Sequence, residues 1–166
     1  MGKIGKIIGA GVLTAVSAVA GAAAGAIYVG VQEEKRLDKM EDNLAKSVCF
    51  YKLLVQWLDL KQQGINLKEF FEFNGYKSVA VYGMKELGER FLDELKDTGI
   101  EVKYVVDRSK DMVVTDLPKY TPDEELPEVD VMVVTAVYYY SDIAEEMEEK
   151  VTFPIVSLED VVYGLV

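Results

Sequence analysis

The chain has 166 residues, a formal net charge of −11, a single cysteine and no histidine. This length accommodates one domain with a core plus an extra segment, and the lack of histidine excludes Ser-His-Asp and Cys-His catalysis and histidine-ligated zinc. Residues 64–166 carry 23 acidic and 10 basic side chains, a surface that repels phosphate backbones, so we expect no nucleic-acid partner.

The first segment is strongly apolar. Residues 7–31, IIGAGVLTAVSAVAGAAAGAIYVGV, contain no charged side chain. A helix of this length rises roughly 37 Å, which exceeds a hydrocarbon core of about 30 Å. We therefore expect residues 1–31 to form a transmembrane anchor helix that contacts the lipid bilayer through residues 7–31. The alternatives are a signal peptide cleaved after the AVA at 18–20 and a soluble alanine-rich helix; the anchor is favoured because the apolar run continues well past residue 20.

Small residues recur every four positions in this segment, and GAAAG at 21–25 matches GxxxG. Small side chains on one helix face let two backbones approach closely, so this glycine-zipper pattern predicts a homo-oligomer. The alternative is that such rows arise by chance in an alanine- and glycine-rich segment. Basic residues are slightly more numerous after the segment than before it, which favours a cytoplasmic globular domain, as does the lack of disulfides.

Residues 32–63 predict a connecting amphipathic helix, because no glycine or proline occurs until Gly64. Cys49 lies in this helix, where we expect a small buried apolar residue rather than a reactive thiol. The apolar stripe is close to a heptad repeat, so the helix either packs on the globular domain or forms a short parallel coiled coil. The stripe comprises Leu37, Met40, Leu44, Val48, Tyr51, Val55 and Leu58, widened by Leu54 and Trp57.

Residues 64–166 predict an α/β domain. Strands are expected at 78–83, 101–107, 129–135 and 153–157, with a small extra strand near Met112–Thr115. Helices are expected after the first strand, at 141–150 with Ser141 as cap, and after Ser157, which forms a capping box with Asp160. Strands that alternate with helices indicate a Rossmann-like parallel sheet flanked by helices.

The stretch SVAVYGMKELGERF at 78–91 resembles a dinucleotide-binding turn. Gly83 and Gly88 occupy the first and third glycine positions of the fingerprint, and Asp107 ends the second strand, where an acid holds a ribose hydroxyl. Lys85 replaces the second glycine. Its side chain either blocks the approach of a pyrophosphate or places an ammonium beside a phosphate at the helix N-terminus. The alternative is that both glycines serve only the turn and the packing.

Residues 57–163 resemble small Rossmann-like NAD(P)-binding modules of bacterial surface-polysaccharide biosynthesis and glycosyltransferase proteins, and their sugar-nucleotide-binding halves. In these modules the turn usually reads YGxGxxG and the next strand ends in Asp. The resemblance implies NAD(P) or a nucleotide-sugar as ligand. It places around this ligand the residues Gly83, Met84, Lys85, Gly88 and Asp107, with Thr135 and Ala136 at the end of the third strand.

The sequence thus predicts a membrane-anchored module that binds a nucleotide or sugar-nucleotide in a regulatory or accessory role. No catalytic residue is assigned, because no tyrosine after the third strand has a lysine four positions on. The alternative is an oligomeric, membrane-associated scaffold protein with a vestigial nucleotide pocket.

Overall fold

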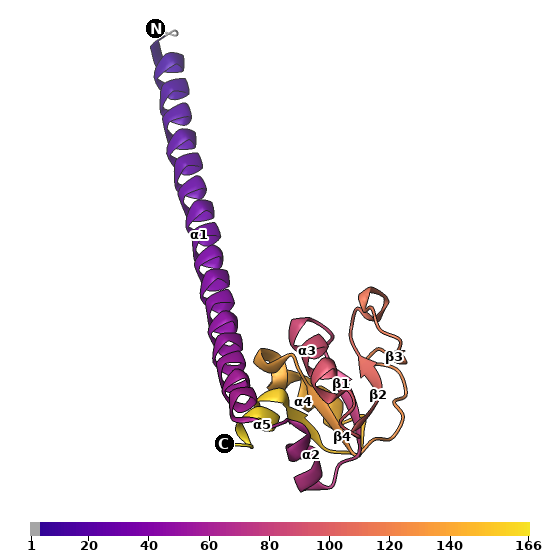
Figure 1. The fold of residues 1–166 in the computed structure, drawn as a ribbon. Coiled ribbons are helices and arrows are strands. Elements are labelled where there is room, and N and C mark those ends of the chain that lie inside the picture. Colours follow the sequence, from indigo (N-terminus) through magenta and orange to yellow (C-terminus); the bar gives the residue numbers. More distant parts are fainter. Residues whose placement is uncertain (1–3) are drawn as a thin grey trace. The chain divides into compact units, whose positions relative to one another are not determined.

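The computed structural model describes the backbone of residues 4–166 and the side chains of residues 33–166 (Figure 1). The chain divides into two compact units, Met1–Lys46 and Ser47–Val166. Helix α1 (Ile4–Gln63) contains the unit boundary, so residues 47–63 belong to the second unit. The anchor and glycine zipper predicted at 7–31 lie outside the residues whose side chains are described. Within the described part of the chain, no helix combines the length and apolar character needed to cross a membrane.

The second unit is a parallel α/β domain, as predicted. Its five strands all run parallel, in the order β3-β2-β1-β4-β5. The strands are β1 (Ser78–Tyr82), β2 (Glu101–Val106), β3 (Lys119–Tyr120), β4 (Val131–Val134) and β5 (Ile155–Ser157). Besides α1, the helices are α2 (Lys68–Asn74), α3 (Glu86–Leu95), α4 (Tyr140–Glu148) and α5 (Leu158–Tyr163), with 3₁₀ turns η1 (Lys110–Met112) and η2 (Val137–Tyr139).

The two faces of the sheet bury separate clusters, because successive side chains of a strand point to opposite faces. Val79 and Val81 of β1 pack with side chains of the end of α1, α2, α3 and α5. Ala80 and Tyr82 pack on the other face with Ile143 of α4 and with apolar residues of the β3–β4 connection. All five residues of β1 are buried, as expected for the central strand of a parallel sheet covered on both sides.

The extra strand predicted near Met112–Thr115 is misplaced. Turn η1 occupies the start of that stretch, and the edge strand β3 forms instead at Lys119–Tyr120. The Asp107 amide donates to the Tyr120 carbonyl at 3.0 Å, and the Tyr120 ring packs edge-on against Tyr104, with centroids 5.1 Å apart. The pairing of β3 with β2 is thus supported by an aromatic contact on the sheet face that carries Ala80 and Tyr82. By contrast, the apolar Val114 is almost fully exposed.

The two helix starts predicted from serine residues differ in outcome. Helix α4 begins at Tyr140 and no side chain caps it, because η2 leads directly into it; the predicted Ser141 cap is wrong. The predicted capping box of α5 is confirmed. The Glu159 amide donates to Ser157 Oγ at 3.1 Å, and the Ser157 amide donates to Asp160 Oδ2 at 2.8 Å.

Cys49 is half-buried, and its thiol donates a hydrogen bond to Glu159 Oε1 at 3.3 Å. Burial, this hydrogen bond and the negative charge of Glu159 raise the pKa of Cys49 to about 11. Because the thiolate is the nucleophile, we expect alkylation at pH 8 about 100-fold slower than for a thiol of unshifted pKa.

The alkylation prediction is checked by iodoacetamide rates between pH 7 and 11. Glu159→Gln removes the carboxylate charge beside Cys49, so it should accelerate alkylation several-fold. The control Glu125→Gln removes a charge at an exposed position that is distant from Cys49 in sequence, and it should leave the alkylation rate unchanged. Equal rates in the wild type and Glu159→Gln would contradict this role of the carboxylate.

Candidate functional site

The predicted turn connects β1 to α3 at the carboxyl edge of the sheet. Gly83 has a φ of +94°, a backbone conformation that residues other than glycine rarely adopt. Its amide donates to the Val106 carbonyl at 2.8 Å, and a Cβ at this position would lie 3.0 Å from Thr135 Oγ1. Gly83 therefore makes the tight turn that the first glycine of the fingerprint makes.

Gly88 lies in the first turn of α3 and packs directly on the preceding turn. A Cβ on Gly88 would lie 2.2 Å from the carbonyl oxygen of Gly83, which is well inside van der Waals contact. No flexible side chain is available to move away, because the obstructing atom belongs to the backbone. The absence of a side chain at Gly88 thus lets α3 start close to the end of β1.

Lys85 is the N-cap residue of α3, with an extended backbone (φ −93°, ψ −160°) and an exposed side chain. The Lys85 side chain makes no capping hydrogen bond to the first turn of α3, whereas Ser157 caps α5. The first amides of a helix carry partial positive charge and attract anions. The N-terminus of α3 thus combines uncapped amides with one exposed ammonium group.

Asp107 lies directly after β2 and faces the turn. Its Oδ2 accepts a hydrogen bond from the Met84 amide at 3.0 Å, and its Oδ1 accepts one from the Ser109 amide at 2.8 Å. The Met84 side chain is buried in the core cluster that contains Val79 and Val81, so only the backbone of Met84 faces the site. An ionised carboxylate has about four lone-pair positions, which leaves Asp107 able to accept further hydrogen bonds.

Thr135 follows β4 and is 3% exposed. Its Oγ1 lies 2.5 Å from the Gly83 carbonyl oxygen and 3.2 Å from that of Tyr82. The hydroxyl is therefore used to join the ends of β1 and β4. Ala136 is adjacent, and its amide nitrogen would lie 3.4 Å from a Cβ on Gly83. The structure thus brings the seven predicted site residues together at one edge of the sheet.

Two residues at this edge are not among those predicted from the sequence. The Tyr82 hydroxyl is buried near the Arg108 guanidinium; burial raises the pKa of Tyr82, and Arg108 opposes this shift. Arg108 Nη2 forms an ion pair with Glu146 Oε2 of α4 at 2.6 Å. In the sequence, Arg108 could have been recognised as a basic residue that directly follows Asp107 at the end of β2.

The three consecutive tyrosines after β4 differ in their surroundings. Tyr140 donates to the Ile155 carbonyl at 3.0 Å and covers the sheet. Tyr138 and Tyr139 are 39% and 46% exposed, and their rings meet edge-on with centroids 5.2 Å apart. Two aromatic rings thus lie partly exposed where the sheet order reverses between β1 and β4, the position at which open α/β sheets bind ligands.

These features define a parallel α/β domain with a glycine-dependent turn at the carboxyl edge of its sheet. No family model, curated protein or solved structure matches the chain. The resemblance to polysaccharide-biosynthesis modules therefore remains an expectation from the sequence.

Proposed function

We propose that residues 64–166 form a Rossmann-like module that binds a nucleotide or nucleotide-sugar in a regulatory or accessory role. In this proposal residues 7–31 anchor the module to a membrane, with the globular domain on the cytoplasmic side. The strand order β3-β2-β1-β4-β5 supports the Rossmann-like assignment, since the first five strands of dinucleotide-binding folds have the same order.

The observation that carries the proposal is the junction of β1 and α3. Gly83 turns the chain at positive φ, and the lack of a side chain at Gly88 lets α3 contact that turn. The N-cap residue Lys85 makes no side-chain hydrogen bond to the first amides of α3. This arrangement presents backbone donors to an anion, as in phosphate-binding turns. The exposed Lys85 supplies a positive charge at the same helix end in place of the missing second glycine.

Asp107 supports a ribose-containing ligand. Its carboxylate already accepts two backbone amides and keeps acceptor capacity for hydroxyl groups. A phosphate placed beside a carboxylate would be repelled, so we place the phosphate at the α3 N-terminus and the ribose at Asp107. Tyr138 and Tyr139 lie past the end of β4, where they offer aromatic surface to a base or sugar.

The accessory role is supported by the chemistry available at this edge. The Thr135 hydroxyl is committed to backbone carbonyls, and the sequence contains no histidine to act as a base. The Asp107 carboxylate accepts hydrogen bonds from two backbone amides, which fixes its orientation as an acceptor for ligand hydroxyl groups. We therefore assign the site to binding and not to a reaction.

The test is thermal unfolding of the full chain in a mild nonionic detergent with NAD, NADH, NADP and several nucleotide-sugars. A ligand at 100 times its dissociation constant should add roughly 2.7 kcal/mol to the free energy of unfolding, which raises Tm by several degrees. Lys85→Glu should reduce the shift, because it reverses the charge at the phosphate position. Lys77→Glu, which makes the same charge change at an exposed position before β1, should preserve it.

A shift of equal size in wild type, Lys85→Glu and Lys77→Glu would mean that the ligand binds elsewhere. No shift with any of these ligands would contradict the proposed function. The oligomeric scaffold with a vestigial pocket would then be the better description.

A further inference from the structure

The part of α1 in the second unit carries apolar side chains on two opposite sides. Leu53, Trp57 and Leu60 are buried in the core cluster on the sheet face covered by α2, α3 and α5. Four other apolar residues remain 40–69% exposed: Tyr51, Leu54, Val55 and Leu58. At about 100° per residue, these two sets point in roughly opposite directions. Because the domain covers only one side, this helix has a second apolar side with no partner among the described residues.

The exposed residues follow a heptad repeat. With Leu37 at position a, the a positions are completed by Leu44, Tyr51 and Leu58; the d positions are Met40, Ser47 and Leu54, of which Ser47 is polar. Leu37, Met40 and Leu44, in the first unit, are 58–64% exposed, so the same pattern of exposed apolar side chains occurs in both units. Apolar a and d positions in successive heptads are the pattern of helices that pair side by side.

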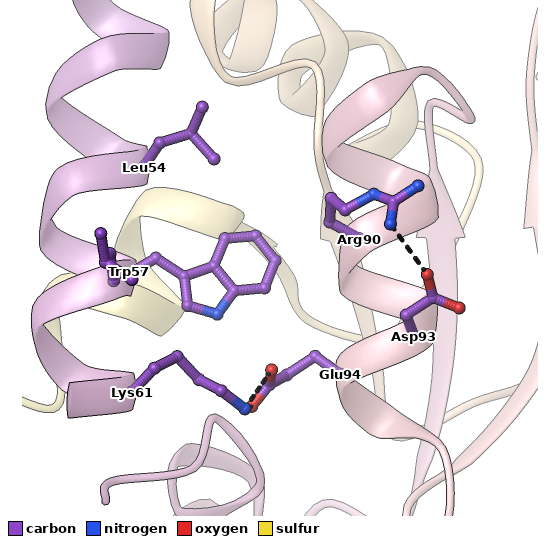
Figure 2. A pocket seen from close by; sticks show the side chains of 7 residues that line it. Leu54, Trp57, Lys61, Arg90, Asp93 and Glu94 are labelled. Carbon is purple, nitrogen blue, oxygen red and sulfur yellow. Dashed lines mark hydrogen bonds and ion pairs between the residues drawn. The ribbon is translucent and has the colours of Figure 1, made fainter. Parts of the chain in front are cut away.

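A groove of about 350 Å³ adjoins the exposed side of α1 in the second unit. Figure 2 shows Leu54, Trp57 and Lys61 of α1 on one wall and Arg90, Asp93 and Glu94 of α3 on the other. Lys61 pairs with Glu94 at 2.7 Å, and Arg90 pairs with Asp93 at 3.3 Å. The apolar surface of Leu54 and Leu58 thus continues into a concave region with charged walls, which offers room for side chains of a second helix.

We propose that this exposed side of α1 binds the same side of a second copy of the chain, with the two helices parallel. The charges of the segment favour a copy over an anionic lipid surface, because residues 32–63 carry six acidic and six basic side chains and are neutral overall. In a parallel pair, Arg36 at a g position faces Glu41 at the e position of the second copy. Opposite charges at g and e positions select parallel pairing in this register.

The first test compares the oligomeric state of the full chain and two variants by sedimentation velocity in a mild nonionic detergent. Leu54→Glu with Leu58→Glu places two negative charges on the proposed interface. The control is Ala45→Glu with Lys52→Gln, at exposed positions beside it, which changes the net charge by the same −2 (−1 and −1). We expect a wild-type dimer, a dimer in the control and at least a 100-fold weaker dimer in the interface variant. Unchanged far-ultraviolet circular dichroism would show that each variant is folded.

A monomeric wild type, or an interface variant that stays dimeric, would overturn the proposal.

The second test reports whether the two helices pair in parallel, and it uses variants made in the Cys49→Ser background. Leu58→Cys should form an intermolecular disulfide under mild oxidation, because a parallel pair brings equivalent a positions together within the range a disulfide spans. Asp59→Cys, one residue on and turned away from the interface, should not. Crosslinking at position 59 but not 58, or at neither, would overturn parallel pairing.

Discussion

Replacing Gly88 with alanine is expected to lower the free energy of unfolding by about 3 kcal/mol, although alanine normally stabilises a helix relative to glycine by about 1 kcal/mol. The added Cβ would lie 2.2 Å from the Gly83 carbonyl oxygen, so α3 has to move away from the end of β1. The measurement is chemical denaturation of the full chain followed by circular dichroism. The sign of the effect separates a packing requirement from helix propensity.

The matched control is Gly99→Ala. Gly99 has a φ of +87°, but a methyl group added there would meet open space, so only backbone strain of about 1 kcal/mol is expected. If Gly88→Ala were as stable as the wild type, α3 could not pack on the turn as the structure has it. The phosphate-binding geometry proposed for that turn would then lose its support.

Replacing Trp57 with alanine is expected to lower the free energy of unfolding by about 3–5 kcal/mol. Trp57 is only 6% exposed and belongs to the core cluster formed with α2, α3 and α5. Removing the indole leaves a cavity between α1 and the rest of the second unit. The prediction is checked by chemical denaturation, with tryptophan-independent detection by far-ultraviolet circular dichroism because Trp57 is the single tryptophan.

Lys52→Ala is the control for Trp57→Ala, because Lys52 is an exposed residue of the same helix. Its replacement should change the stability by less than about 0.5 kcal/mol. If Trp57→Ala were equally mild, residues 47–63 would not contribute to the fold of the second unit. The helix would then be only a connection, and its assignment to that compact unit would be contradicted.

The central strands could be predicted because their sequences have a single physical explanation. Four or more consecutive apolar residues bounded by turn residues, as in SVAVY and VMVV, fit a strand buried on both faces. The capping box of α5 was equally local, since Ser157 and Asp160 need only each other and their own backbone. Local patterns of this kind carry their own stabilisation and can therefore be recognised in the sequence.

The edge strand depended on a contact between residues that are distant in sequence. β3 forms where Tyr120 packs on Tyr104, whereas in the apolar stretch before it only Val113 is buried and Met112 and Val114 are exposed. The heptad pattern identified the exposed stripe of α1, but of its residues only Trp57 packs on the domain, together with Leu53 and Leu60, which the stripe did not include. An apolar pattern on both sides of a helix does not say which side the domain covers.

The sequence predicted where the candidate site lies in the fold, but not the contacts that its residues make. Glycine spacing and the acid at the end of β2 located Gly83, Gly88 and Asp107 at one edge of the sheet. The hydrogen bond from the Met84 amide to Asp107 and the neighbourhood of Arg108 and Tyr82 depend on how β1, β2 and α4 pack. Ligand binding by these residues remains a prediction.

The most direct measurement is a two-dimensional ¹H–¹⁵N spectrum of the full chain in detergent, recorded while NAD or a nucleotide-sugar is added. We predict that amide signals of Lys85, Glu86, Leu87 and Gly88 shift with a common dissociation constant, together with that of Asp107. Signals of the groove residues Trp57 and Arg90 should stay in place. Shifts confined to the groove, or unchanged spectra with every ligand, would contradict nucleotide binding at the β1–α3 turn.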